Sequence, residues 1–129
     1  VLKIIDGRAL TGAERLDMCV QMACGADLMS DVLAFTHDGT LLLTGLTNPQ
    51  AVRTGEMAGV RAITFVRGKL PPQATISLAI EKGIPLLATR LTLYEACGRL
   101  FAAGLPSCGL SELSEDAWHD AFCESADGR

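Results

Sequence analysis

Three short apolar segments of this chain are each followed directly by polar and cationic residues. These residues are Thr44–Gly45–Leu46–Thr47–Asn48, Arg67–Gly68–Lys69 and Thr89–Arg90–Leu91–Thr92. Hydroxyl groups, glycines that let a ligand approach the backbone, and cationic side chains are the groups that hold phosphates. We therefore expect a small anionic ligand, either a nucleotide or a phosphate-bearing metabolite, to bind at these turns. The expected binding residues are Thr44, Gly45, Thr47, Asn48, Arg67, Gly68, Lys69 and Thr89, with Arg53 or Arg90 as counter-charge.

The same residue types also have a simpler explanation, which the sequence leaves open. Turns use Gly and Thr for capping alone, and cations at an exposed edge are ordinary solvated surface. Neither G-x-x-x-x-G-K-[ST] nor G-x-G-x-x-G, the common phosphate-binding signatures, is present. Arg53 could reach the turns or could pair with Glu56, three residues later on the same helix.

No catalytic arrangement accompanies these residues. His37 and His119 lie far from the three turns in sequence, so no Ser/Cys–His–acid set can be proposed. The cysteines form no C-x-x-C pair, and their spacing matches no zinc or cluster pattern. We expect no enzyme activity, no cofactor and no metal. An odd number of cysteines suits a reducing cytoplasm, with idle or buried thiols at Cys19, Cys24, Cys97, Cys108 and Cys123.

Three repeats of strand, turn and amphipathic helix must position the turns. The strands are continuous apolar runs, typical of strands covered on both faces, at 41–44, 61–66 and 85–89. Each helix opens with a proline or a Thr–Glu capping box and is followed by a glycine. The expected helices are 49–58, 72–82 and 93–103. Such repeats give right-handed crossovers, so we predict an α/β fold of three-layer βα repeats with a mainly parallel sheet, plus a C-terminal helical tail.

The first thirty residues are expected to add strands, either to the same sheet or to that of a second copy. Residues 1–5 alternate enough to form an edge strand that Asp6–Gly7 ends, and residues 16–24 favour a strand over a helix. Asp27 is the expected N-cap of a helix that follows.

Beyond Gly104 the strand–turn–helix repeats end, and the sequence becomes more acidic. Residues 105–109 suggest a linker, and 113–125 suggest an amphipathic helix with Trp118 and Phe122 on its apolar face and acids on the other. This helix could dock on its own domain, or it could contact a second subunit or a partner protein. We therefore divide the chain into an α/β domain, 1–104, and a linker with a C-terminal amphipathic helix, 105–129.

Composition narrows the class of protein. With 129 residues and 49% hydrophobic residues, the chain has enough material for one core. The formal net charge of −4 argues against nucleic acid as the main partner, although the repeat region is locally basic and the C-terminal region is acidic. No apolar run approaches the roughly 20 residues of a membrane helix, and we expect no signal peptide. The first residue is Val1 rather than Met, which suggests a processed product or a domain excised from a larger protein.

Several short segments, in this order and spacing, resemble the DRTGG domain family, particularly its short stand-alone members. The resemblance covers roughly residues 25–105. In the position of the acidic, basic and hydroxyl residues that name the family, this chain has Gly45–Leu46–Thr47, with no Asp or Arg. The segments that carry the resemblance are 26–32, 43–50, 52–54, 65–69, 83–89 and 94–98.

The resemblance implies a bacterial, often anaerobic, cytoplasmic regulatory module without chemistry of its own. Related domains occur within long phosphate acetyltransferases, beside nucleotide-binding CBS pairs and ahead of HPr kinase, and short members occur among genes for iron-only hydrogenases. Our first hypothesis is a homodimeric regulatory domain that binds a small anion. The alternatives are a protein-interaction adaptor in a hydrogenase or redox signalling system, and a regulatory fragment of a phosphotransacetylase-like enzyme.

Overall fold

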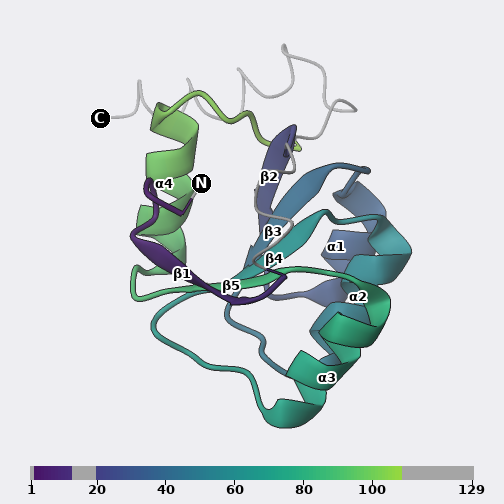
Figure 1. Cartoon of the computed structure of the whole chain (residues 1–129). Coiled ribbons are helices and arrows are strands. Elements are labelled where there is room, and N and C mark those ends of the chain that lie inside the picture. Colours follow the sequence, from purple (N-terminus) through teal and green to yellow (C-terminus); the bar gives the residue numbers. More distant parts are fainter. Residues whose placement is uncertain (1, 13–19, 109–129) are drawn as a thin grey trace, which may run out of the picture.

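A five-stranded, mainly parallel sheet forms the centre of the molecule (Figure 1). The computed structural model describes residues 2–12 and 20–108. The strands lie in the order β1-β5-β4-β3-β2, with β1 antiparallel to β5 and the other pairs parallel. Their bounds are β1 Gly7–Thr11, β2 Met22–Gly25, β3 Thr40–Thr44, β4 Ala62–Phe65 and β5 Leu86–Thr89.

Helices cover both faces of this sheet (Figure 1). Steps from β2 to β3, β4 and β5 all move the same way across the sheet, so right-handed crossovers put their helices on one face. After β5 the chain returns over the opposite face to the outer edge of β2, where Ser107 forms a bridge with Ala23. The helices are α1 Met29–Phe35, α2 Pro49–Ala58 and α3 Gln73–Lys82 on the first face, and α4 Leu93–Ala102 on the second.

The apolar strands supply both cores, as their composition predicts. Leu42 packs with α1, α2 and α3 on one face, while Leu41 and Leu43 pack against α4 on the other. All three leucines are at most 1% exposed. The three predicted βα repeats are confirmed, and a fourth unit, β2 with α1, precedes them.

The predicted helix ends agree closely with the structure. Asn48 caps α2 by accepting a hydrogen bond from the Ala51 N–H at 3.3 Å, and Thr92 caps α4 by accepting from the Glu95 N–H at 3.1 Å. Gly59 and Gly83 close α2 and α3 with left-handed φ angles of 77° and 71°, which glycine adopts without steric strain.

The prediction of a strand over residues 1–5 is wrong. Residues 2–6 form turns, and the strand begins at Gly7. The segment is apolar because it covers the face of the sheet that α4 also covers, where Ile5 is fully buried and Leu2 and Ile4 pack at its side. An apolar turn under a helix and a buried strand have the same composition, which explains the error.

The segment expected to begin a linker lies against the sheet. The Ala23 N–H donates to the Pro106 carbonyl at 2.9 Å, and the Cys108 N–H donates to the Ala23 carbonyl at 3.2 Å. The helix predicted over 113–125 lies outside the described residues, so it and the division of the chain at 104 stay predictions. Among the described residues, no helix is long and apolar enough to cross a membrane.

Candidate functional site

The three turns predicted to bind an anion meet at one edge of the sheet. We call the residues 44–48, 66–69 and 89–92 the strand-end rim. The Lys69 Nζ donates to the Gly45 carbonyl at 3.1 Å, which joins the first turn to the second. The Arg67 N–H donates to the Leu91 carbonyl at 2.7 Å and the Gly68 N–H to that of Thr89 at 2.9 Å, which joins the second turn to the third.

The first turn binds the carboxylate of Asp27. Its Oδ1 accepts a hydrogen bond from the Gly45 N–H at 2.7 Å and another from the Thr44 hydroxyl at 3.0 Å. The hydrogen bond from the Gly45 N–H lowers the pKa of Asp27 below 3.8, with smaller contributions from the Thr44 hydroxyl and the charges of Arg67 and Lys69, while partial burial opposes them. A carboxylate of the protein therefore occupies a place where we had expected a ligand.

The prediction that Asp27 caps a helix is wrong. α1 begins after Leu28, and no side chain caps its N-terminus. Asp27 instead follows β2, which is the parallel neighbour of β3, so its side chain reaches the carboxyl end of β3. The residue lies beside the strand-end rim because it too follows a parallel strand of the sheet. Recognising β2 as a member of the parallel sheet would have placed it there.

Thr44 and Thr89 have matching structural roles. Each hydroxyl accepts a hydrogen bond from the N–H two residues later, at 3.1 Å from Leu46 and 3.2 Å from Leu91. Each also donates one, Thr44 to Asp27 and Thr89 to the Ile5 carbonyl at 2.5 Å. Both side chains are buried, so their hydroxyls hold the rim together and do not face solvent.

The second turn carries an unusual backbone. Arg67 and Gly68 have φ angles of 61° and 69°, and the Lys69 N–H donates to the Val66 carbonyl at 3.2 Å. Two left-handed residues closed by this bond are typical of a type I′ turn, in which Asn, Asp and Gly are preferred. An added Cβ at Gly45 would lie 2.8 Å from an Arg67 guanidinium nitrogen, so Gly45 lets this cation reach the first turn.

The remaining predicted binding residues divide into two groups. Asn48, Arg67, Gly68, Lys69 and Arg90 are exposed along the rim, while the Thr47 carbonyl accepts from the Thr75 hydroxyl at 2.7 Å. Arg53 lies on α2, outside the three turns.

Arg53 lines a surface groove of about 440 Å³ between α2 and α3, together with Glu81. The alternative partner considered for Arg53, Glu56, lies 3.5 Å from the Lys82 Nζ.

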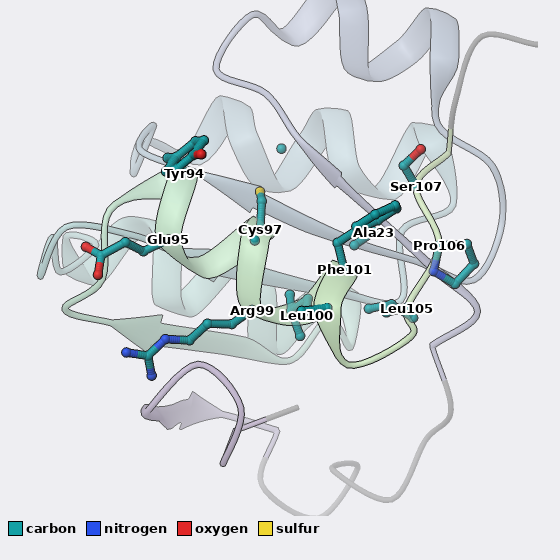
Figure 2. Close-up of a pocket in the computed structure, with 13 residues that line it drawn as sticks. Ala23, Tyr94, Glu95, Cys97, Arg99, Leu100, Phe101, Leu105, Pro106 and Ser107 are labelled. Carbon is teal, nitrogen blue, oxygen red and sulfur yellow. The ribbon is translucent and has the colours of Figure 1, made fainter.

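A second groove, of about 630 Å³, lies along α4 beside the outer edge of β2 (Figure 2). Its lining is largely apolar and includes Tyr94, Phe101, Leu105 and Pro106. Neither groove contains the exposed cations Arg67 and Lys69. Positive charge, and not either of these two grooves, is the property of the described rim that would recruit an anion.

Three of the predicted idle or buried thiols lie among the described residues. Cys24, Cys97 and Cys108 are free and half-buried, and burial is the main cause that raises the pKa of Cys108 to about 11. A high pKa keeps the thiol protonated and unreactive. Over residues 2–12 and 20–108, no group of His, Cys, Asp and Glu could hold a metal ion. Cys19 and Cys123 lie outside the described residues.

The fold is shared with a known regulatory region. The structure is similar to that of the CBS and DRTGG domains of the regulatory region of Clostridium perfringens pyrophosphatase, solved in complex with its activator diadenosine tetraphosphate. The TM-score is 0.66 at 18% sequence identity, and the match covers 98% of this chain and 57% of that one. This chain thus spans little more than half the length of that structure, and the likeness shows a common fold. No family model and no curated protein matches the sequence.

Proposed function

We propose that this chain is a non-catalytic regulatory domain of the DRTGG type that binds a phosphate-bearing metabolite or nucleotide at the strand-end rim. The conformation of Arg67 carries the proposal. A left-handed backbone is unfavourable by about 1–2 kcal/mol for a residue with a Cβ, and such strain gathers at functional sites. Here the strained residue is an exposed arginine that reaches Gly45 and stands two residues before Lys69.

The charges of the rim favour a ligand with more than one phosphate. Arg67, Lys69 and Arg90 contribute three positive charges, and the carboxylate of Asp27 offsets one of them. A singly charged anion gains little electrostatic binding energy here, because the Asp27 carboxylate repels it. A polyphosphate can contact several of the cations while its charges stay away from this carboxylate. Gly68, which has open space around it, lets such a ligand approach the backbone. The dinucleotide activator of the structural neighbour belongs to this chemical class.

Thermal unfolding in the presence of inorganic phosphate, pyrophosphate, ATP and diadenosine tetraphosphate tests the proposal. We expect at least one polyphosphate to raise the Tm in proportion to the logarithm of its concentration once this exceeds the Kd, by an amount that corresponds to about 2.7 kcal/mol at 100 times the Kd. Arg67→Asn should abolish the rise without weakening the fold, because asparagine tolerates a left-handed backbone better than arginine. Its Tm without ligand should equal or exceed that of the wild type.

Two further variants make the result specific. Lys69→Ala should also abolish the rise, with some loss of stability because its hydrogen bond to Gly45 disappears. Lys82→Ala removes a cation that pairs with Glu56 on another face and should keep the full response. The proposal fails if no anion raises the Tm, or if Lys82→Ala reduces the response as much as Arg67→Asn.

The adaptor hypothesis also has an observation in its favour. Tyr94 and Phe101 on α4 are 88% and 69% exposed, and exposed aromatic residues are typical of protein contacts. Trp118 and Phe122, which the sequence had suggested for this role, lie outside the described residues. A partner in a hydrogenase or redox system stays a prediction.

A further inference from the structure

α4 presents an apolar stripe to solvent. An α-helix turns by about 100° per residue, which puts Tyr94, Gly98, Phe101 and Ala102 within one sector about 100° wide. All four residues are exposed, and the space around Gly98 is open. Figure 2 shows Tyr94 and Phe101 on this side of the helix, beside the groove that also contains Leu105 and Pro106. A helix that served only to cover its own sheet would need no such stripe.

We infer that this stripe is a dimer interface, in which α4 packs antiparallel against α4 of a second copy around a two-fold axis close to Gly98. In such an interface, if residue i contacts residue j of the partner, then j contacts i. Tyr94 lies four residues before Gly98, and Phe101 and Ala102 lie three and four residues after it. Tyr94 of each copy therefore meets the partner's Phe101 and Ala102, and the two Gly98 residues meet at the crossing point.

Gly98 suits the crossing point of two helices. The distance between packed helices depends on the side chains at their contact, and it is shortest where these are small. A Cβ added at Gly98 would meet nothing within 4 Å, so no contact with residues 2–12 or 20–108 of the same copy requires a glycine there. A glycine at this position would let the backbone of a second helix approach closely.

Charges beside the stripe select the antiparallel orientation. Glu95 and Arg99 are exposed and project together from another side of α4 (Figure 2). The Glu95 carboxylate accepts a hydrogen bond from the Thr92 hydroxyl at 3.3 Å, and no ion pair joins it to Arg99 in the part of the chain that the structure describes.

When two such helices run antiparallel, each Glu95 lies opposite the partner's Arg99. When they run parallel, two-fold symmetry puts the Glu95–Arg99 flanks of the two helices on opposite sides of the interface, so these charges do not pair across it. The surface is thus complementary to itself in one orientation.

This inference does not depend on anion binding. The pairing residues begin at Tyr94 and continue toward the end of α4, whereas the exposed cations of the strand-end rim belong to other turns. Either proposal can therefore fail while the other holds.

Sedimentation equilibrium of the full chain, over a range from about 1 to 200 µM, tests the interface. We expect a dimer of twice the 13.6 kDa chain mass. Phe101→Glu should raise the dimer Kd by about 100-fold or more, because a charge replaces a central aromatic residue in both copies. Met57→Glu is the matched control. Met57 is 73% exposed on α2, and its replacement should leave the dimer unchanged.

Charge reversal tests the orientation. Glu95→Arg and Arg99→Glu should each raise the dimer Kd by about tenfold, because like charges then face each other across the axis. The double variant should return the Kd to near the wild-type value. The thermal midpoint of each variant shows whether the fold has survived.

Two results would overturn the inference: a wild-type chain that stays monomeric at 200 µM, and a dimer that Phe101→Glu leaves intact. If the wild type is monomeric, Trp118, the single tryptophan of the chain, tests what covers the stripe. If the wild type is a monomer in which Phe101→Glu shifts the tryptophan emission to longer wavelength, the C-terminal segment occupies the stripe instead of a second copy.

Discussion

Asp27→Ala should lower the free energy of unfolding by about 1–2 kcal/mol, since a hydrogen bond to a charged group contributes about 1.5–3 kcal/mol and solvent access at Asp27 reduces this. The substitution removes the acceptor of the Gly45 N–H, at 2.7 Å, and of the Thr44 hydroxyl, at 3.0 Å. Gly45 is buried, so its N–H is not easily rehydrated. Chemical denaturation should show a lower midpoint with an unchanged slope.

The same variant should gain a strong response to inorganic phosphate. Without Asp27, the Gly45 N–H and the Thr44 hydroxyl lie unused beside the cations Arg67 and Lys69. A phosphate ion can then take the place of the carboxylate and restore the lost stability by mass action. Asp31→Ala, which removes an exposed carboxylate of α1, should show no added response to phosphate. If phosphate stabilises Asp27→Ala no more than the wild type, the rim does not bind anions in the way we describe.

The pH dependence of stability should change in the same variant. The pKa of Asp27 in the folded state lies below its value in the unfolded state, so the ionised carboxylate stabilises the fold at every pH above about 4. This contribution is lost as the pH falls through the folded-state pKa. Asp27→Ala lacks it, and its stability should therefore fall less steeply on acidification below pH 4 than that of the wild type.

Thr89→Val should destabilise the protein by about 2–4 kcal/mol, because two backbone groups lose a partner and each such loss costs about 1–3 kcal/mol. The Thr89 hydroxyl donates to the Ile5 carbonyl at 2.5 Å and accepts from the Leu91 N–H at 3.2 Å. Valine has nearly the same shape, so the effect isolates the hydroxyl. Urea denaturation measures the change, and hydrogen exchange at Gly7–Thr11 should show that β1 is loosened.

Thr64→Val is the matched control and should have the opposite sign. Thr64 is a fully buried strand residue like Thr89, but its hydroxyl has no hydrogen-bond partner in the described part of the chain. Removal of an unsatisfied buried hydroxyl should leave stability unchanged or raise it by about 1 kcal/mol. If both variants lose stability equally, side-chain packing and not the hydrogen bonds of Thr89 explains the loss.

Local patterns were enough to predict the repeats. The run 41–44 is apolar on both faces because this strand contacts both cores, and the helix signals that follow it distinguish it from an apolar turn such as residues 2–6. The helix ends could also be predicted, because they depend on hydrogen bonds and backbone angles within a few residues, at Asn48, Thr92 and Gly59.

Contacts between segments far apart in the sequence could not be predicted from such local patterns. Ile5 meets Thr89 across 84 residues, and Asp27 meets Gly45 across 18. To predict the contact of Ile5, one must know that the N-terminal turn packs on the face of the sheet that α4 covers. To predict the contact of Asp27, one must know that β2 pairs with β3. The hydrogen bonds that Thr44 and Thr89 make within the protein could not be predicted for this reason, and ligand binding by these residues stays a prediction. The exposure of Arg67, Lys69 and Arg90 after their strands needed no such knowledge, and anion binding by them stays a proposal.

An NMR titration of the ¹⁵N-labelled protein with inorganic pyrophosphate tests the central claim most directly, because it locates the anion as well as detecting it. We predict saturable shifts of the Gly68 and Arg90 amides and of their neighbours on the strand-end rim, which Arg67→Asn abolishes. Shifts confined to Arg53 and the groove between α2 and α3, or no saturable shift at millimolar pyrophosphate, would contradict the account.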